Sequence, residues 1–489
     1  MSDHSQDRFE RARSLVGLLV GPIGFVLLLL YPVKDISGAA HSLLAVLWLV
    51  VIFWITEPIP IPATALLGSI LAVLCGVAPV QEVFAPYGDP VIFLFMGSFI
   101  VAKSMTIHGL DRRFAGMILR RESLSGSPAG IIFAIGIIST LISMWMSNTA
   151  VAAMMMPIAM CVLEPYGGKD SRSRIIGDGA LVVAYAASIG GIATPVGSPP
   201  NLITLALIRK TLNVDIPFFQ WMLIGVPLSL LMFLALFLMM RVGRGGVAER
   251  HHRSIAECVG ISASRLSRGE RNTLVAFGTM VSLWVIPGFI GIFWGTDSPL
   301  YRLYNERMPE SAAAILAAVL LFLLPVNFRE RKFTISWREA VKISWGTILL
   351  FGGGLSLGAL MFKTGLGDAL ARVILQTTGQ VSLTMLTAVS LTTAVVLTEF
   401  TSNTAAANII VPVAISLAKA LNLPPIPPVL GACFGSSLAF MLPISTPPNA
   451  IAYATGHVPI TRMILAGVKL DIVAAAIVIL VLKLYGALG

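Results

Sequence analysis

Long apolar runs, separated by short polar stretches, follow one another along most of the chain. A run of about 20 apolar residues is long enough to cross a bilayer as a helix. Such runs occur at about 15–31, 41–56, 61–80, 89–108, 217–240, 271–293, 311–326, 345–362 and 463–486. The pattern predicts an all-α polytopic membrane protein.

Two further apolar stretches, 127–165 and 380–418, differ from these runs. Each is about 39 residues long, which is too long for one crossing, and neither holds a polar loop that would separate two crossings. Polar triplets stand at their centres, Ser147-Asn148-Thr149 in the first and Ser402-Asn403-Thr404 in the second. We therefore predict two re-entrant hairpins, a backbone form tolerated where protein or a water-filled cavity surrounds it.

The composition supports a membrane protein and excludes other classes. Of the 489 residues, 56% are apolar and 12% are charged, against about 25% charged in an ordinary soluble domain. A large soluble enzyme, a disordered chain and a fibrous chain are thereby excluded. The net charge of +10 comes from basic residues in short loops, so nucleic-acid binding is not expected. The four cysteines form no CxxC pair, and we expect neither a disulfide framework nor a zinc site.

The distribution of Lys and Arg predicts the orientation. Residues 1–13 are polar and precede an apolar run that could imitate a secretory signal, but the run is long and many spans follow. We therefore expect a retained first helix. With a cytoplasmic amino terminus, two re-entrant hairpins and eleven crossings, cytoplasmic segments hold 23 Lys and Arg and external segments nine. This positive-inside bias supports a cytoplasmic amino terminus, and we expect the protein in a bacterial inner membrane.

The chain contains one pattern twice. Residues 97–110 align without a gap to residues 353–366, and each copy leads into one of the two hairpins. Downstream of the hairpins come GSPPN at 197–201 and STPPN at 445–449. These motifs predict broken helices at about 177–208 and 425–456. Because the hairpins are expected to open to opposite sides, we predict an inverted repeat, which is typical of secondary transporters.

The repeat divides the chain into four parts. Residues 1–40 form a tail and a first helix, and 41–240 form the first repeat. Residues 241–270 form a basic cytoplasmic linker, and 271–489 form the second repeat.

The four polar motifs predict the chemistry of the site. N-terminal ends of half-helices attract carboxylates or other oxyanions, and unwound carbonyls with Ser, Thr and Asn oxygens suit Na⁺. No Lys, Arg or His lies within 143–163, 188–208, 392–418 or 436–456. A dianion there would need co-bound cations, which favours symport over exchange unless a basic side chain arrives from another segment.

The doubled SNT triplet with its downstream GSPPN and STPPN motifs resembles the divalent anion/sodium symporter family, which includes INDY-type dicarboxylate carriers. The resemblance runs from residues 57–60 (EPIP) to the last helix. It implies a homodimer in which a transport domain moves against a scaffold domain by an elevator mechanism. The implied activity is sodium-coupled symport of C4-dicarboxylates such as succinate, malate and fumarate.

The resemblance also implies a set of site residues. One sodium ion would be bound by Ser143, Ser147, Asn148 and the Gly197 carbonyl. A second sodium ion would be bound, partly through backbone carbonyls, by Thr398, Thr401, Asn403 and Ser445. The substrate would be held by Ser147, Asn148, Thr149, Ser198, Ser402, Asn403, Thr404, Thr446 and Pro447.

Several alternatives stay open at this stage. A dicarboxylate exchanger and a sulfate or citrate carrier of the same fold are the nearest ones. The GLSLG sequence at 354–358 matches the GxSxG pattern of serine hydrolases, but it lies in an apolar helix instead of a strand–turn–helix context. Glu399 is expected either to support the cation site or to be a buried scaffold residue. Glu57 is expected at an interface or in hairpin packing, and His108 at a helix end.

Overall fold

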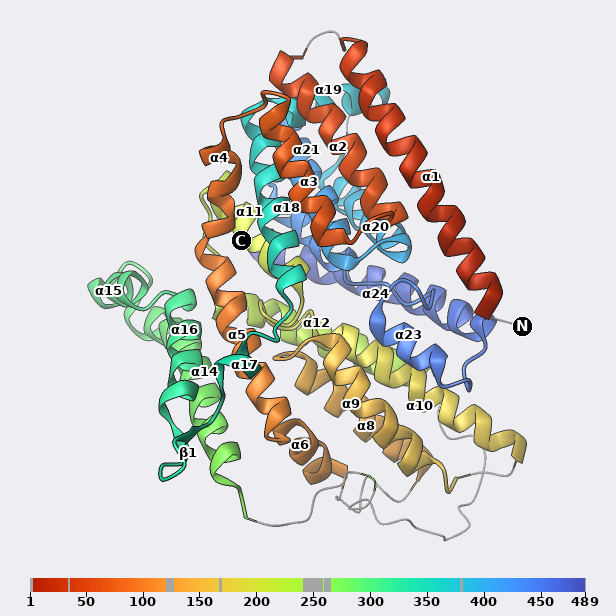
Figure 1. Cartoon of the computed structure of the whole chain (residues 1–489), viewed down its shortest axis with the longest axis vertical. Coiled ribbons are helices and arrows are strands. Elements are labelled where there is room, and N and C mark those ends of the chain that lie inside the picture. The colour runs from red at the N-terminus through yellow and green to blue at the C-terminus, as the bar shows by residue number, and fades with distance from the viewer. Residues whose placement is uncertain are drawn as a thin grey trace.

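The computed structural model describes residues 3–33, 36–119, 127–166, 169–240, 258, 265–378 and 381–488. Almost all of these residues are helical, and the helices form one elongated bundle (Figure 1). A two-stranded antiparallel ribbon of β1 (Pro325–Asn327) and β2 (Lys332–Phe333) is the exception within these ranges. The prediction of an all-α membrane fold is confirmed.

The first half of the chain builds its helices in the predicted order. They are α1 (Asp3–Leu30), α2 (Gly38–Thr56), α3 (Ile61–Leu74), α4 (Val80–Phe84), the 3₁₀ helix η1 (Ala85–Gly88), α5 (Pro90–Ile107), α6 (Leu110–Leu119), α8 (Pro128–Ser143), α9 (Asn148–Leu163), α10 (Lys169–Gly190), α11 (Pro199–Leu212) and α12 (Phe218–Met239).

The second half follows the same plan. Its helices are α14 (Arg268–Trp294), α15 (Pro299–Arg307), α16 (Glu310–Leu323), α17 (Trp337–Ala340), α18 (Trp345–Lys363), α19 (Leu366–Thr378), α20 (Leu383–Phe400), α21 (Asn403–Ala420), α22 (Ile426–Gly435), α23 (Pro447–Ala454) and α24 (Ile460–Leu488).

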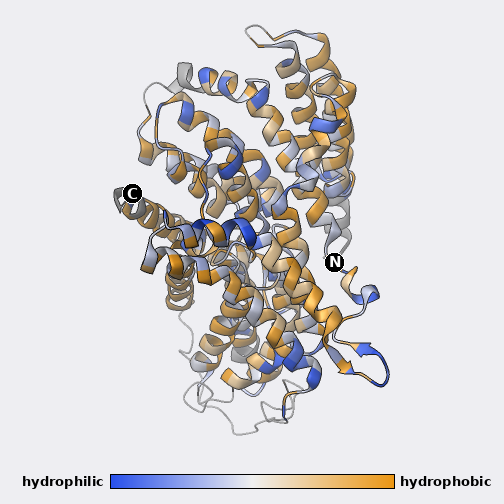
Figure 2. Ribbon diagram, turned by 90° about the vertical axis from the view of Figure 1, so that its left-hand side faces the viewer, coloured by the Kyte–Doolittle hydropathy of each residue, from blue (hydrophilic) through white to orange (hydrophobic). Residues whose placement is uncertain are grey.

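Most helices are coloured as hydrophobic in Figure 2, and many of their large apolar side chains are exposed. Among the described residues, nine helices are long and apolar enough to cross a membrane. Both arms of the second hairpin, α20 and α21, are among these nine, whereas the shorter α3 and α16 are not. Length and composition therefore support a polytopic membrane protein, while the count of eleven crossings and the orientation stay predictions.

A seam of small residues joins the first two helices. At Gly17, Gly21 and Gly24 of α1, an added Cβ would lie within 3 Å of side chains of α2. Small residues let membrane helices approach closely and gain van der Waals contact. The seam therefore fixes the second half of α1 against α2, with Gly17 next to Thr56 at the end of α2.

The internal repeat is visible in the backbone. Gly109 follows α5 with φ of 70°, and Gly365 follows α18 with φ of 75°. Glycine adopts this left-handed conformation without the steric cost that a Cβ brings. Both glycines turn the chain into a shorter helix, α6 or α19, which leads toward a hairpin.

Both predicted hairpins are present, each as two contacting helices. In the first, α8 ends at Ser143 and α9 begins at Asn148; in the second, α20 ends at Phe400 and α21 begins at Asn403. The side chains of Ser147 and Ser402 cap the second arms. The polar triplets therefore form the hairpin tips, as expected.

The two broken helices also lie where the motifs predict. Between α10 and α11 the chain leaves the helix at residues 191–198, and between α22 and α23 it does so at residues 436–446. Each second half-helix begins with the two prolines of its motif. Proline lacks an N–H and fits the first turn of a helix, where that donor would have no intrahelical acceptor.

The expectation about cysteines is wrong for one pair. Cys161 and Cys258 form a disulfide, with Cα atoms 5.6 Å apart, although 97 residues separate them in the sequence. Sequence spacing misses this pair because Cys258 lies between α12 and α14 and meets the last turn of α9 only in the folded chain. The rest of the predicted linker from 241 to 264 lies outside the described residues.

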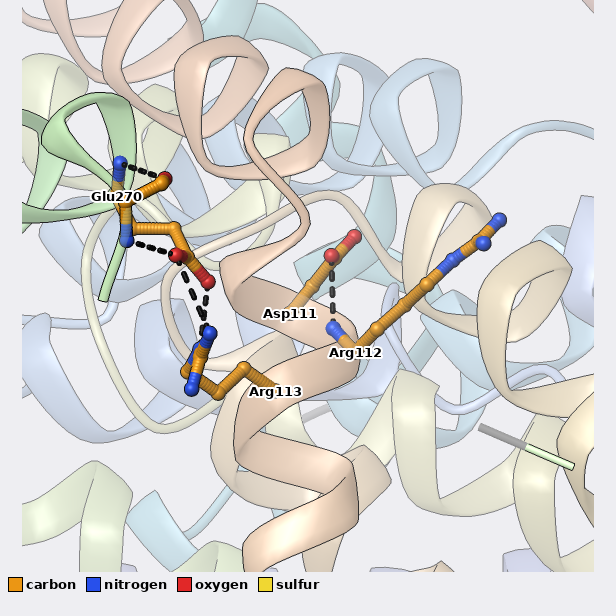
Figure 3. Close-up of polar contacts among 5 residues, drawn as sticks. Asp111, Arg112, Arg113 and Glu270 are labelled. Atoms are coloured by element: carbon orange, nitrogen blue, oxygen red, sulfur yellow. Dashed lines mark hydrogen bonds and ion pairs between the residues drawn. The ribbon is translucent and has the colours of Figure 1, made fainter. Parts of the chain in front are cut away.

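A polar cluster ties the helix before the first hairpin to α14 (Figure 3). Arg113 of α6 contacts both carboxylate oxygens of Glu270, with Nε–Oε1 at 2.5 Å and Nη2–Oε2 at 3.2 Å. Glu270 also accepts a hydrogen bond from the Ser267 N–H at 2.6 Å in a capping box. Nearby, burial raises the pKa of Asp111, although the Arg112 N–H donates to its carboxylate and opposes this shift. The cluster holds α6 in place.

Candidate functional site: two hairpin tips and two broken helices

The tip of the first hairpin is organised by its own side chains. The Ser143 hydroxyl donates to Asn148 Oδ1 across 2.8 Å, which joins the end of α8 to the start of α9. The Ser147 hydroxyl accepts a hydrogen bond from the Ala150 N–H at 3.3 Å. The amide oxygen of Asn148 is thus held at the tip by a hydroxyl.

The first broken helix is braced by the asparagine of its own motif. Asn201 Nδ2 donates to the carbonyls of Gly191, at 2.8 Å, and Thr194, at 2.7 Å. Thr194 in turn donates to the Met144 carbonyl of the hairpin. Unwinding removes the helical hydrogen bonds of these carbonyls. A buried carbonyl without a partner would cost about 1–3 kcal/mol, so the Asn201 amide stabilises the unwound segment.

Three predicted ligands of the first sodium ion lie together. A Cβ built on Gly191 would stand 2.6 Å from Asn148 Oδ1 and 3.1 Å from the Gly197 carbonyl oxygen. Because Ser143 contacts Asn148, its hydroxyl joins the same group. Glycine at 191 leaves the space that a side chain would fill.

The tip of the second hairpin repeats this arrangement. Thr398 Oγ1 lies 2.8 Å from Asn403 Oδ1 and 2.9 Å from the carbonyl oxygen of Ser436. The hydroxyl again precedes the asparagine by five residues. Two members of the predicted second sodium site are therefore in direct contact.

The second broken helix repeats the brace. Asn449 Nδ2 donates to the carbonyls of Ala439 and Leu442, at 3.0 and 3.1 Å. These carbonyls lie ten and seven residues before it, as in the first repeat. The Ser445 hydroxyl lies 3.2 Å from the same nitrogen, and Asn449 Oδ1 is buried without a donor among the described residues. A buried amide oxygen of this kind suits a cation.

Thr401 and Ser445, the other predicted members of the second site, have different partners. The Thr401 hydroxyl donates to the Trp54 carbonyl of α2 across 2.6 Å. The Ser445 hydroxyl donates to the Leu442 carbonyl across 2.7 Å, within the unwound segment. The side chain of Thr401 therefore anchors the hairpin to α2, and only its backbone is left for the predicted ligation.

Four helices begin at these motifs, and they meet in pairs. Helix α9 contacts α23, and α21 contacts α11. The predicted substrate residues range from exposed to buried. Ser147, Thr149 and Pro447 are exposed, Asn148, Ser402 and Asn403 are half-buried, and Ser198, Thr404 and Thr446 are buried. The partial positive charge of each helix N-terminus would favour a bound carboxylate.

Glu399 lies behind the second site as a support for the backbone. Its carboxylate accepts hydrogen bonds from the N–H groups of Met441, at 2.9 Å, and Leu442, at 3.1 Å. It thereby fixes the unwound segment that carries Ser445. Of the two expectations for Glu399, these contacts favour the buried scaffold role.

A cavity of about 950 Å³ opens beside the second broken helix. Its lining includes Thr446, Pro447 and Tyr453, together with Arg13 and Glu57. Sequence reasoning missed Arg13 as a candidate, because only the fold brings α1 to α23.

Two residues singled out in the sequence have structural roles. His108 follows the last residue of α5, and its Nε2 lies 2.8 Å from the Thr334 carbonyl oxygen, as expected of a helix-end residue. Ser356 of the GLSLG sequence is buried within α18 and donates to the Val83 carbonyl. The strand–turn–helix context of a hydrolase is absent there.

A family model and several curated relatives match nearly the whole chain. The family model described as "Sodium:sulfate symporter transmembrane region" matches residues 12–488. A sodium-dependent dicarboxylate transporter, SdcS, of Staphylococcus saprophyticus is 32% identical, covering 98% of this chain and 93% of the relative. The SdcS protein of Staphylococcus aureus is 30% identical, covering 96% of this chain and 91% of the relative.

Solved structures show the same fold at lower similarity. The YdaH transporter of Alcanivorax borkumensis has a TM-score of 0.59 at 15% identity and covers 98% of both chains. MtrF of Neisseria gonorrhoeae has a TM-score of 0.55 at 12% identity, over 84% of this chain and 83% of that one. The match over nearly the whole length, together with the doubled hairpin and broken-helix motifs, shows that this chain is a transporter of the sodium:sulfate symporter family and not an enzyme.

Proposed function

We propose that the protein couples the inward movement of Na⁺ to the uptake of C4-dicarboxylates such as succinate, malate and fumarate. One observation carries this proposal. A hydroxyl–asparagine contact of 2.8 Å occurs at each hairpin tip, at Ser143–Asn148 and at Thr398–Asn403. Each contact stands beside an unwound segment that an asparagine braces.

The polar groups at each tip suit sodium. Asn148 Oδ1, Ser143 Oγ and the Gly197 carbonyl supply neutral oxygens in the first repeat. Asn403, Thr398, Ser445 and the backbone of Thr401 do so in the second. Neutral oxygens from unwound backbone and short side chains are the usual sodium ligands of transporters built on broken helices. The family description and the names of the Staphylococcus relatives, which both include sodium, support this assignment.

The substrate would lie between the two sodium ions, at the N-termini of α9, α11, α21 and α23. Carboxylate oxygens would accept hydrogen bonds from Asn148, Thr149, Asn403, Thr404 and Thr446. Helix N-termini contribute about half a positive charge each, and two sodium ions would balance a dianion. This coupling follows from charge, because bound sodium ions add to the positive potential of the helix N-termini and so strengthen the binding of a dianion. The relatives' names, which specify dicarboxylates, support this substrate class.

The movement would follow an elevator mechanism. In this proposal the hairpins, the broken helices, α12 and α24 move together against a scaffold formed by the remaining long helices. The protein would work as a homodimer in a bacterial inner membrane, with its amino terminus in the cytoplasm. Thr401, which bonds the Trp54 carbonyl of α2, marks one place where the two parts would separate.

Uptake into proteoliposomes tests the proposal. Vesicles without internal substrate receive labelled succinate under an inward Na⁺ gradient or an equal K⁺ gradient. We expect accumulation with Na⁺ alone, and unlabelled fumarate and malate should compete. Uptake that requires preloaded succinate and ignores Na⁺ would indicate an exchanger. Competition by sulfate or citrate, without competition by fumarate, would indicate another substrate class within the family.

A further inference from the structure

The cavity beside α23 brings one basic side chain to a site whose own segments contain none. Thr446 begins α23 and belongs to the proposed substrate site, and the cavity that reaches it is also lined by Arg13 and Glu57. Figure 1 shows the beginning of α1 next to α23 and α24. Among the described lining residues, Arg13 carries the positive charge and Glu57 the negative charge.

The position of Arg13 is fixed by packing. Gly17 lies one helical turn after Arg13 on the same face of α1, and a Cβ there would stand 2.0 Å from Thr56 Oγ1. The close approach of α1 to the end of α2 therefore holds the guanidinium next to Glu57, the residue after Thr56. Glu57 has a left-handed backbone, with φ of 49°, a conformation that costs a non-glycine residue free energy and often occurs at functional sites.

The ion pair leaves capacity for another anion. Arg13 Nη2 and Glu57 Oε1 are 3.6 Å apart, beyond the distance of a direct hydrogen bond. Arg13 Nε is buried and has no acceptor among the described residues. A guanidinium offers five N–H donors in a planar fork that matches a carboxylate. One carboxylate could therefore occupy donors that Glu57 leaves unused.

We propose that Arg13 and Glu57 form an exchangeable ion pair that binds one carboxylate of the incoming or departing dicarboxylate in this cavity, ahead of the site at Thr446. The substrate carboxylate first binds guanidinium donors that Glu57 leaves unused and then replaces the 3.6 Å contact with the Glu57 carboxylate, so the charge on Arg13 stays balanced at every stage. Because Glu57 competes for the guanidinium, Arg13 does not hold the substrate anion so tightly that its release is blocked. This inference rests on the proposed function, because it takes a dicarboxylate as the cargo.

Kinetics on the two membrane faces test the pair. Arg13→Gln removes the charge and keeps most of the length, whereas Arg13→Lys keeps the charge. On the face where α1 begins, we expect Arg13→Gln to raise KM for succinate about tenfold, the loss expected for one charge-assisted hydrogen bond. The KM on the other face should stay within twofold, and the maximal rate from the α1 face should rise with its KM, because the ratio of Vmax to KM for the two directions is fixed by the gradients. Arg13→Lys should recover most of the affinity.

A matched control and a second variant keep the test decisive. Arg302 of α15 forms an ion pair of similar length, 3.7 Å, with Asp297, which precedes that helix. Arg302→Gln should leave both KM values unchanged. Glu57→Gln should lower KM on the α1 face, because the guanidinium then lacks its competing carboxylate. This variant carries the test if Arg13→Gln fails to fold.

Failure of this inference differs from failure of the proposed function. If vesicles that contain the wild-type protein show no sodium-driven succinate uptake, both the proposed function and this inference are overturned. Sodium-driven wild-type uptake with unchanged KM values in Arg13→Gln and Glu57→Gln would overturn the exchangeable pair alone. An equal rise of KM on both faces would also overturn it.

Discussion

Thr398 Oγ1 lies 2.8 Å from Asn403 Oδ1, and this contact joins the two arms of the second hairpin. Ser143 and Asn148 repeat it at the same distance in the first hairpin. In both pairs five residues separate the hydroxyl from the amide, so the repeat extends from the sequence to individual atoms. The two contacts define the places where we expect sodium.

Removal of either tip amide should abolish coupled uptake. Asn148→Ala and Asn403→Ala each delete an amide that is assigned both to sodium and to substrate. We expect sodium-dependent succinate uptake below a few per cent of wild type, with an unchanged elution volume in detergent. Asn305→Ala on α15 provides a control outside the site. Wild-type uptake by both tip variants would contradict the site assignment.

Gly191→Ala tests whether the first sodium site needs an empty space. The new Cβ would stand 2.6 Å from Asn148 Oδ1, so the amide must move and sodium affinity should fall. We expect the sodium concentration for half-maximal uptake to rise at least severalfold. At Gly278 of α14 an added Cβ meets nothing within 4 Å, and Gly278→Ala should leave uptake unchanged. Equal behaviour of the two variants would argue against the geometry.

The two bracing asparagines should contribute to stability. Asn201→Ala and Asn449→Ala each remove a side-chain amide that donates to two carbonyls of an unwound segment, although the Thr194 and Leu442 carbonyls keep a second donor. We expect each to lower the free energy of unfolding by about 1–3 kcal/mol, measured as a lower midpoint of thermal unfolding in detergent. Midpoints equal to that of wild type would show that water replaces the amide at no cost.

The disulfide predicts a thiol count. Cys75 and Cys433 are free, while Cys161 and Cys258 are joined. In the denatured, unreduced protein, a maleimide reagent should therefore add two labels, and after reduction it should add four. Mass spectrometry of the intact chain reads both numbers. Four labels before reduction would show that the pair is not oxidised.

The sequence predicts the spans, the hairpin tips and the broken helices because each has a local signature. Apolar runs, a polar triplet at the centre of a long run and a doubled proline all act through neighbouring residues. The internal repeat supports these predictions independently. Gly109 and Gly365, which align in the sequence, have the same left-handed backbone conformation, and each precedes a hairpin.

Other features depend on contacts between distant segments, which local patterns do not report. The Cys161–Cys258 disulfide, the bond from Thr401 to the Trp54 carbonyl and the cavity that joins Arg13 to Thr446 are of this kind. The roles of Asn201 and Asn449 could have been inferred from the sequence. Both asparagines stand in the repeated PPN motif, beside a helix break that leaves carbonyls without donors.

The ratio of transported ions tests the central claim most directly. Radioactive sodium and labelled succinate are followed in the same proteoliposomes, with K⁺ inside and the membrane potential clamped. Two sodium sites predict at least two sodium ions taken up with each succinate, and Asn403→Ala should abolish both fluxes together. Succinate uptake without any accompanying sodium would contradict sodium-coupled transport through these sites.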